Sequence, residues 1–304
     1  MFKVTSRWPH QNSIKVEWNL GKRCNYDCSY CPSSIHDNTS EHTDIELLKR
    51  TVDKLVALDK PVRLSFTGGE PTVHPKFEEL INYCKHVGIT WVSVTTNGTR
   101  KPEWYINQRA DHWVFSLHFE YDYKKIATTI SSVHKERQIM VNVMAHQDHM
   151  EAVKDTVGYF DAVKVPCVIR RVRWTEGDHN LFDDMRYDGK DLDWILSRES
   201  TVKDNVEIQY ATESGPATRT MHANDVIKTH NNKFKGWTCN AGLESLMINW
   251  DGEVHRATCR VGSSLGNIYH DSFVAPIDPI TCTRDWCTCS ADIPLTKYDK
   301  NHSN

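Results

Sequence analysis

The hydrophobic and polar residues in the first half of the chain alternate in a way that predicts strands separated by helices. Residues 14–20 (IKVEWNL) place apolar side chains at every second position, which is the period of a strand. Short apolar runs predict five further strands, at residues 62–66, 90–95, 112–119, 138–145 and 167–173. The pattern therefore indicates six strands by residue 174.

Apolar residues at helical spacing fill the intervals between these strands. Thr43 and Glu46 have the spacing of a capping box, which predicts a helix over residues 44–58. Pro75 can occupy the first turn of a second helix, in which Cys84 is expected to be a core residue. Two further helices are predicted, over residues 121–136 and 149–160.

Strands and helices that alternate in this rhythm favour parallel pairing through right-handed crossovers. The expected fold class is therefore α/β. Six strand–helix units are fewer than the eight of a complete barrel, and sites in such folds lie at the carboxyl ends of the strands. We expect residues 1–174 to form this core, with residues 1–12 as a short tail or edge segment.

The chain changes character after residue 174. Residues 175–238 are polar, and we interpret them as a connection across the mouth of the core. Two short helices are predicted within this connection, near residues 190–198 and 222–232. Residues 239–304 form the third predicted region, in which Asp251-Gly252 between two apolar runs indicates a β-hairpin.

Three cysteines, Cys24, Cys28 and Cys31, lie within eight residues in the spacing C-x3-C-x2-C, just after the first predicted strand. Packing needs alone rarely group free thiols in this way. Three thiolates can hold three irons of a four-iron cluster and leave the fourth iron open to another ligand. The alternatives are a zinc site that borrows a fourth ligand, or disulfides.

A second motif follows the strand predicted at residues 62–66. Gly68 and Gly69 let the backbone turn with positive φ and approach a ligand closely, and the carboxylate of Glu70 would suit an ammonium group. The two motifs are one strand–helix unit apart, and the aromatic Tyr30 directly precedes the third cysteine. In this combination the sequence resembles the radical S-adenosylmethionine (SAM) superfamily.

The resemblance implies a partial (β/α)6 TIM-like barrel with its active site at the C-terminal strand ends. It also implies a 4Fe–4S cluster held by the three early cysteines, with SAM chelating the open iron. The residues expected to meet SAM are Tyr30, Gly68, Gly69, Glu70, Asn97 and Ser116. The reduced cluster would cleave SAM to a 5′-deoxyadenosyl radical that abstracts a hydrogen atom, and a flavodoxin- or ferredoxin-type donor would supply the electron.

Several polar side chains lie on the later predicted strands. Ser116 shares a strand face with His118 and Glu120, and we expect this face to point into the barrel. Contact of His118 and Glu120 with substrate and a satisfied polar network are the two alternatives. Asn142 on the next strand is a similar candidate, and Asn97 is part of an Asn-Gly pair that can also be a simple turn.

Three arginines, Arg170, Arg171 and Arg173, crowd the last predicted strand. Strand alternation sends at least one of them inward. An inward arginine can clamp a carboxylate of SAM or of the substrate. The sequence does not define the face, and we name Arg171 as the candidate.

Five cysteines near the C-terminus form a second group: Cys239, Cys259, Cys282, Cys287 and Cys289. The region resembles the twitch or shortened SPASM extension of many radical SAM enzymes, which implies one auxiliary iron–sulfur cluster, of the 4Fe–4S type, and one spare thiol. The fit is partial. The extension usually places a glycine a few residues before its second cysteine, whereas six residues separate Gly252 from Cys259, and the tail spacing departs from the longer SPASM pattern. A structural zinc site and core cysteines without metal are the alternatives.

Composition and charge narrow the class of protein. The 304 residues are 39% hydrophobic and carry a net charge of −3, which argues against a large nucleic-acid partner. Clustered cysteines suggest metal binding in a reducing compartment. The sequence shows neither a hydrophobic signal region nor an apolar run long enough to span a membrane. We therefore expect a cytoplasmic protein.

The leading hypothesis is a radical SAM enzyme, an oxidoreductase or radical-mediated transferase or isomerase, that oxidises or rearranges a small molecule with help from an auxiliary cluster. No peptide-binding module precedes the strand that starts near residue 14, which favours a small metabolite. The alternatives are a peptide-modifying maturase, or an epimerase that uses the spare thiol as hydrogen donor. A non-catalytic zinc or iron–sulfur protein is the alternative from another class.

Overall fold

The computed structural model describes residues 1–7, 12–172, 187–199 and 205–299. The chain divides into two compact units. The first, which we call the parallel-sheet unit, comprises Trp18–Asp53 and Leu64–Thr201. The second, the cysteine-rich unit, comprises Met1–Glu17, Lys54–Arg63 and Val202–Asn304. The N-terminal segment thus clusters with the cysteine-rich residues, and the domain limits expected at residues 174 and 238 stay a prediction.

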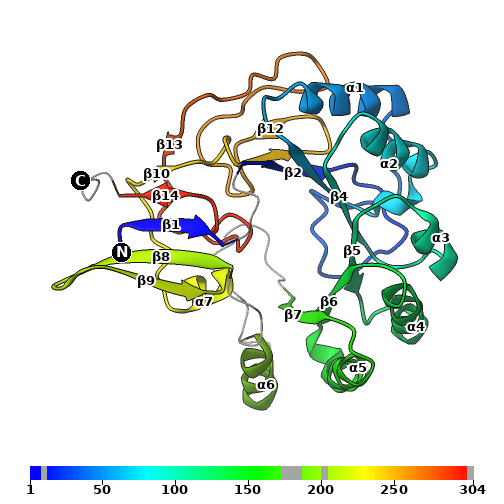
Figure 1. The fold of residues 1–304 in the computed structure, drawn as a ribbon. Coiled ribbons are helices and arrows are strands. Elements are labelled where there is room, and N and C mark those ends of the chain that lie inside the picture. Colours follow the sequence, from blue (N-terminus) through cyan, green and yellow to red (C-terminus); the bar gives the residue numbers. More distant parts are fainter. Residues whose placement is uncertain (8–11, 173–186, 200–204, 300–304) are drawn as a thin grey trace. The chain divides into compact units, whose positions relative to one another are not determined.

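The strands of the parallel sheet are neighbours in the order in which they occur along the chain. They are β2 (Ile14–Asn19), β3 (Val62–Thr67), β4 (Trp91–Thr96), β5 (His112–Leu117), β6 (Ile139–Ala145) and β7 (Cys167–Arg171). The pairs β4–β5, β5–β6 and β6–β7 are parallel. The predicted α/β class with a parallel sheet is confirmed (Figure 1).

Helices connect these strands. They are α1 (Ile45–Val56), α2 (Phe77–His86), α3 (Pro102–Asn107), α4 (Tyr123–His134), α5 (Met150–Ala162) and, after β7, α6 (Gly189–Glu199), with short 3-10 turns η1 (Pro71–Val73) and η2 (Gln147–His149). Helices α2 to α5 lie along the same outer side of strands β4 to β7 (Figure 1). This arrangement is the one expected when helices make the crossovers between parallel strands.

The structure differs from the predicted helices at two points. Oδ1 of Asp44 accepts hydrogen bonds from the backbone N–H groups of Glu46 and Leu47, both at 3.1 Å. Asp44 therefore caps α1, and the capping box expected at Thr43 is wrong. Helix α3 was not predicted because its six residues are too few for a periodic pattern. It is anchored by Tyr105, whose ring centroid lies 5.0 Å from that of Trp113.

Alternation along the strands separates an apolar face from a polar one. In β5, Trp113, Phe115 and Leu117 are fully buried on the face that packs against the helices. Ser116 points to the opposite face and is registered with Asn142 of β6. Side chains of registered residues share one face of a sheet, so polar groups of neighbouring strands gather on the face away from the helices.

The cysteine-rich unit contains a sheet of short strands. In spatial order they are β13 (Ile280–Thr281), β10 (Thr238–Cys239), β14 (Lys297–Tyr298), β1 (Lys3–Ser6), β8 (Val206–Thr212) and β9 (Gly215–Met221). Strand β1 lies between β14 and β8, and its Val4 is fully buried. The expectation of a tail or edge segment at residues 1–12 is therefore wrong for β1, because pairing partners distant in sequence cover both of its edges.

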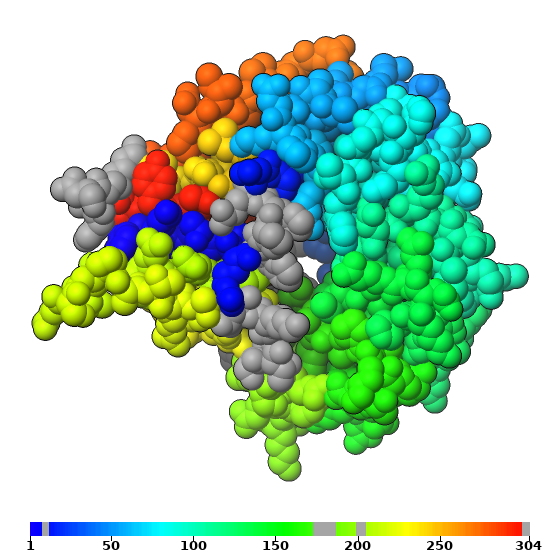
Figure 2. Space-filling model, viewed as in Figure 1, coloured from blue at the N-terminus to red at the C-terminus, as the bar shows by residue number. Residues whose placement is uncertain are grey.

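Two hairpins complete this unit. The predicted hairpin is confirmed: β11 (Ser245–Ile248) pairs antiparallel with β12 (Val254–His255), and Gly252 in the turn has a φ of +86°. The β8–β9 hairpin was not predicted, because most of β9 is polar and exposed. Its tip projects into solvent as the yellow-green lobe in Figure 2.

A short helix, α7 (Ala223–Lys228), follows β9 near the helix expected at residues 222–232. Of the helices in the described ranges, none is both long and apolar enough to cross a membrane.

Candidate functional site

The three early cysteines lie in a loop after β2 that is closed at its base. The N–H of Cys24 donates to the carbonyl of Asp37 at 2.8 Å, and the N–H of Asp37 donates to the carbonyl of Lys22 at 3.0 Å. The carboxylate of Asp37 also accepts hydrogen bonds from the N–H and hydroxyl of Ser40, at 2.8 and 2.5 Å. Residues 24–37 therefore form a closed loop, which we call the cysteine loop.

The three thiols of this loop influence one another. A hydrogen bond between Cys28 and Cys31 raises the pKa of Cys28 and lowers the pKa of Cys31 to about 7. Burial is the main cause that raises the pKa of Cys24 to about 11, and the charges of Glu70 and Cys31 add to the rise. All three thiols belong to the one closed loop, and each influences the pKa of another. The donor set therefore fits an iron–sulfur cluster, which binds thiolates.

The glycine loop after β3 packs directly on the start of the cysteine loop. Gly68 and Gly69 have φ angles of +82° and +44°. A Cβ on Gly69 would lie 2.3 Å from the carbonyl oxygen of Arg23, and that carbonyl accepts a hydrogen bond from the N–H of Glu70 at 2.9 Å. Only glycine allows this φ together with this approach. The two sequence motifs are therefore in contact.

The carboxylate of Glu70 is buried, with 3% of the residue exposed, and four protein groups donate to it. Its Oε1 accepts from the N–H and hydroxyl of Thr72, at 3.0 and 2.6 Å, and from the hydroxyl of Thr96 at 2.8 Å. Its Oε2 accepts from the N–H of Asn97 at 2.5 Å. Burial raises the pKa of Glu70, and these hydrogen bonds oppose that rise. The carboxylate thus joins the ends of β3 and β4, and its contact with the SAM ammonium stays a prediction.

Asn97 links the end of β4 to the cysteine loop. Its Nδ2 donates to Oδ1 of Asn25 at 2.8 Å and lies 3.9 Å from Sγ of Cys24. Its Oδ1 accepts a hydrogen bond from the hydroxyl of Thr99 at 2.9 Å. The Asn-Gly pair is therefore a turn that also holds a polar side chain beside the first cysteine.

Aromatic residues cover the second cysteine. Nδ1 of His118 lies 2.5 Å from the hydroxyl of Tyr30 and 3.5 Å from Sγ of Cys28. The Tyr30 ring stacks on that of His118, with centroids 5.9 Å apart. Burial lowers the pKa of His118 to about 4, so the imidazole is neutral at pH 7. His118, for which substrate contact and a polar network were the two alternatives, contacts the cysteine loop.

Glu120 and Tyr121, which follow β5, hold the backbone of the same loop. Oε2 of Glu120 accepts a hydrogen bond from the N–H of Ser29 at 3.1 Å, and the hydroxyl of Tyr121 accepts one from the N–H of Asp27. The ring of Tyr121 stacks on that of Tyr26 at 3.7 Å. Of the two alternatives for Glu120, the hydrogen bond to Ser29 corresponds to a satisfied polar network rather than to contact with substrate. The tyrosine pair was missed, because no spacing rule connects residues so far apart in sequence.

The polar face of the sheet carries an arginine, but not the one named from the sequence. Nε of Arg170 donates to Oδ1 of Asn142 at 3.0 Å, so Arg170 shares a face with Asn142 and Ser116. Arg171 alternates to the opposite face, where it is registered with the buried Ala145. The expectation that Arg171 points inward is therefore corrected in favour of Arg170. Arg173 lies outside the described residues.

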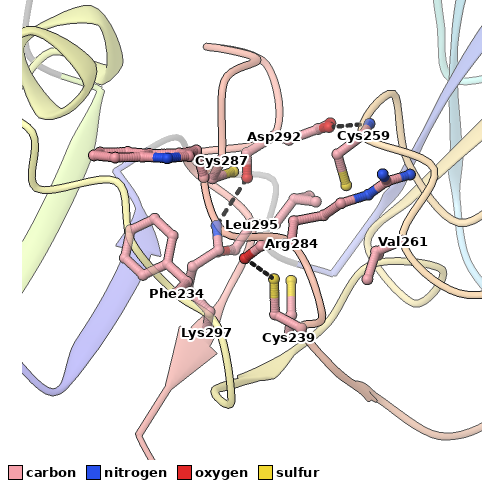
Figure 3. A pocket seen from close by; sticks show the side chains of 11 residues that line it. Phe234, Cys239, Cys259, Val261, Arg284, Cys287, Asp292, Leu295 and Lys297 are labelled. Atoms are coloured by element: carbon pink, nitrogen blue, oxygen red, sulfur yellow. Dashed lines mark hydrogen bonds between the residues drawn. The ribbon is translucent and has the colours of Figure 1, made fainter. Parts of the chain in front are cut away.

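Four of the five late cysteines line one pocket: Cys239, Cys259, Cys282 and Cys287. Figure 3 shows three of them, Cys239, Cys259 and Cys287, together with Asp292 and Lys297. Burial raises the pKa of these three thiols, that of Cys287 to about 12, and the charge of another thiol of the group raises each further. Thiols are the ligand type that an iron–sulfur cluster binds, and a shared metal group in this pocket stays a prediction.

Backbone hydrogen bonds fix the segments that carry these thiols. The N–H of Cys259 donates to Oδ2 of Asp292 at 2.7 Å, and the N–H of Cys287 donates to the carbonyl of Asn232 at 2.8 Å. The N–H of Cys282 donates to the carbonyl of Trp237, also at 2.8 Å. Asp292 was missed from the sequence, because a single aspartate near the chain end carries no motif.

Cys289 stands apart from this group. It is not among the residues that line the pocket, and burial and the charge of Asp292 raise its pKa to about 11. Its carbonyl accepts hydrogen bonds from the N–H groups of Asp292 and Ile293.

Among the residues that the structure describes, no three His, Cys, Asp or Glu side chains converge on a point that would suit a single metal ion.

Comparison with known families agrees with the fold and with both early motifs. Residues 18–172, half of the chain, match the family model of the Radical SAM superfamily. The chain therefore belongs to the radical SAM superfamily. Members of this superfamily are enzymes, and membership implies a 4Fe–4S cluster and SAM.

Two curated relatives illustrate the range of this family. Fe-coproporphyrin III synthase of Methanosarcina barkeri is 38% identical over 85 residues, which are 28% of this chain and 21% of the relative. An S-adenosylmethionine-dependent nucleotide dehydratase of Pseudoalteromonas ulvae is 25% identical over 276 residues, which are 81% of this chain and 83% of the relative. The match to the Methanosarcina enzyme thus spans only a fifth of that enzyme's length.

SuiB of Streptococcus suis has a similar fold. Its structure with bound S-adenosylmethionine aligns with a TM-score of 0.54 at 17% identity, over 86% of this chain and 64% of SuiB. Its structure with the precursor peptide SuiA aligns with a TM-score of 0.55. At this identity the likeness concerns the fold alone.

Proposed function

We propose that this chain is a radical SAM enzyme that holds its 4Fe–4S cluster through Cys24, Cys28 and Cys31 and binds SAM beside the Gly68–Glu70 loop. The observation that carries the proposal is the hydrogen bond from the N–H of Glu70 to the carbonyl of Arg23, because it joins the cluster motif to the SAM motif. When bound, the cluster and SAM would supply a 5′-deoxyadenosyl radical for hydrogen abstraction.

The chain's own residues would orient these groups and exclude water. The absence of side chains at Gly68 and Gly69 leaves the backbone free for the methionine end of SAM. Tyr30 and His118 would cover the cysteine loop at Cys28, which keeps stray hydrogen donors away from a reactive radical. Ser116 and Asn142, on the polar sheet face, would contact SAM or substrate.

An auxiliary 4Fe–4S cluster would be held by the four cysteines that line the pocket of the cysteine-rich unit. These four thiols equal the number of ligands in a closed cluster, and Cys289 would be the spare thiol. Such a cluster could accept the electron that remains on the substrate after hydrogen abstraction. A zinc ion in the same site would leave the radical chemistry unchanged but would remove this electron acceptor.

The proposed substrate is a small molecule, and a nucleotide is the class that the comparisons favour. The support is the Pseudoalteromonas nucleotide dehydratase, whose similarity extends over 81% of this chain. A peptide substrate is the second candidate, favoured by the fold likeness to SuiB, which has been solved with its precursor peptide. Superfamily membership argues against the non-catalytic alternative. A flavodoxin- or ferredoxin-type donor and a cytoplasmic location remain part of the proposal.

The test is SAM cleavage by the anaerobically purified, dithionite-reduced protein. We expect 5′-deoxyadenosine to accumulate slowly without substrate and faster with the correct nucleotide. Replacing Cys28 with Ala should abolish it, because the open-iron cluster then loses a ligand. Continued cleavage by Cys28→Ala would contradict the ligand assignment, whereas Cys84→Ala, which alters a buried cysteine of α2, should retain it.

A further inference from the structure

Lys297 of β14 is a buried lysine in the wall of the cysteine-lined pocket, with only 2% of its surface exposed. It is registered with Cys239 on the neighbouring strand β10, so the two side chains share one face of the sheet. Figure 3 shows it beneath Asp292, with its ammonium directed toward the turn at residues 292–295. Lysine is almost never fully buried unless it is paired, so groups that compensate its charge are expected around it.

The hydrogen bonds of Lys297 define its protonation state. Nζ donates to the carbonyls of Asp292, Ile293 and Leu295, at 2.9, 2.8 and 3.1 Å. Three donated hydrogen bonds require three N–H groups, which only the ammonium has. The ammonium also lies 4.9 Å from the ring centroid of Phe234, over the ring face. Lys297 therefore brings a full positive charge into the pocket wall.

The acceptors of this ammonium in the described ranges are those three backbone carbonyls. The carboxylate of Asp292, which also lines the pocket, accepts a hydrogen bond from the N–H of Cys259. Arg284 lines the pocket as well, but it is an exposed residue. A buried charge is costly unless an opposite charge compensates it, so the buried ammonium of Lys297 favours a negative charge among the four thiols.

We propose that the Lys297 ammonium is the fixed counter-charge of an anionic iron–sulfur cluster in this pocket and that it raises the reduction potential of that cluster. This inference rests on the auxiliary cluster of the proposed function. A cluster with four thiolate ligands has a net negative charge that grows by one when an electron enters. A nearby buried cation stabilises the more negative, reduced form, and net charge is one of the factors that set these potentials. Lys297 would thus make electron acceptance by the cluster easier without itself contacting the substrate.

The test is a redox titration of the auxiliary cluster alone, monitored by electron paramagnetic resonance. The starting protein carries Cys24→Ala, Cys28→Ala and Cys31→Ala, so that only the second site binds iron. In this background Lys297→Met and Lys297→Gln remove the charge, and glutamine keeps two N–H donors for the carbonyls. We expect the ratio of reduced to oxidised cluster at a fixed potential to fall at least tenfold, which equals 59 mV for a one-electron couple.

Two variants serve as controls. Lys297→Arg keeps the charge and should keep the potential near that of the parent. Lys235→Met removes an exposed lysine of the same unit, whose ion pair with Asp285 is in solvent, and screening should leave the potential unchanged.

The outcomes separate this proposal from the one on which it rests. If the parent background binds no iron, or binds zinc, the auxiliary cluster itself is refuted. If it binds a cluster but both neutral variants titrate like the parent, the role of Lys297 is refuted. If neither neutral variant folds even without metal, the lysine serves only to hold the turn at residues 292–295, and the proposal is again overturned.

Discussion

The carboxylate of Glu70, at the end of β3, accepts a hydrogen bond from the backbone N–H of Asn97, at the end of β4, at 2.5 Å. Because the side chain of Asn97 in turn donates to Asn25, the two residues couple the glycine loop to the cysteine loop. Glu70, expected from the sequence to contact a ligand, therefore also has a structural role, because it holds the ends of β3 and β4 against the cysteine loop.

Replacing Glu70 with Gln should destabilise the protein although the side chain keeps its size. The amide can still accept at Oε1, but its NH2 group faces the N–H of Asn97, which leaves a buried donor unsatisfied at a cost of about 1–3 kcal/mol. Urea unfolding of the metal-free protein measures this. Glu78→Gln, at an exposed position in the first turn of α2, is the matched control and should change stability by less than about 0.5 kcal/mol. Equal stabilities of the two variants would refute the structural role of Glu70.

Gly69→Ala should disrupt the contact between the two motifs. Its Cβ would meet the carbonyl of Arg23 at 2.3 Å, and a φ of +44° costs a residue with a side chain roughly 1–3 kcal/mol before the clash is counted. We expect loss of 5′-deoxyadenosine formation together with a lower melting temperature.

The control for that experiment is Gly158→Ala in α5, where no atom lies within 4 Å of the added Cβ. There alanine should stabilise the helix by roughly 0.5–1 kcal/mol and leave SAM cleavage intact. Normal cleavage by Gly69→Ala would show that the loops do not need this contact.

Serine substitutions should distinguish the ligand thiols from the spare one. Cys289→Ser is expected to keep about eight irons per chain, whereas Cys259→Ser should retain only about four, because one thiol of the pocket is lost. Iron analysis of anaerobically reconstituted protein gives the answer. Loss of iron in Cys289→Ser, with retention in Cys259→Ser, would reverse the assignment.

Val4→Ala tests whether β1 is an inner strand. Val4 is fully buried between β14 and β8, and losing two methyl groups there should cost about 1.5–3 kcal/mol. Thr5→Ala, at the next, partly exposed position, should change the free energy of unfolding by less than about 0.5 kcal/mol. Chemical denaturation of both variants decides, since a free tail would tolerate either change equally.

Local patterns determined much of this protein. The alternation in residues 14–20 and the five short apolar runs that follow predicted the strands, since such patterns are visible within a few residues. The spacing of Cys24, Cys28 and Cys31, followed by Gly68-Gly69-Glu70, indicated the radical SAM superfamily. The Asp251-Gly252 turn predicted its hairpin, because turn chemistry is equally local.

Only the tertiary structure decided which distant residues meet. It assigned the inward position to Arg170 rather than Arg171, because the register of β7 against β6 sets the face of each residue. It brought β1 between two strands from the other end of the chain, and it separated Cys289 from four thiols that line one pocket. It placed Lys297 in register with Cys239 on the neighbouring strand, which is the contact behind the role proposed for its charge. Such contacts depend on how separate segments pack, and no short stretch of sequence records that packing.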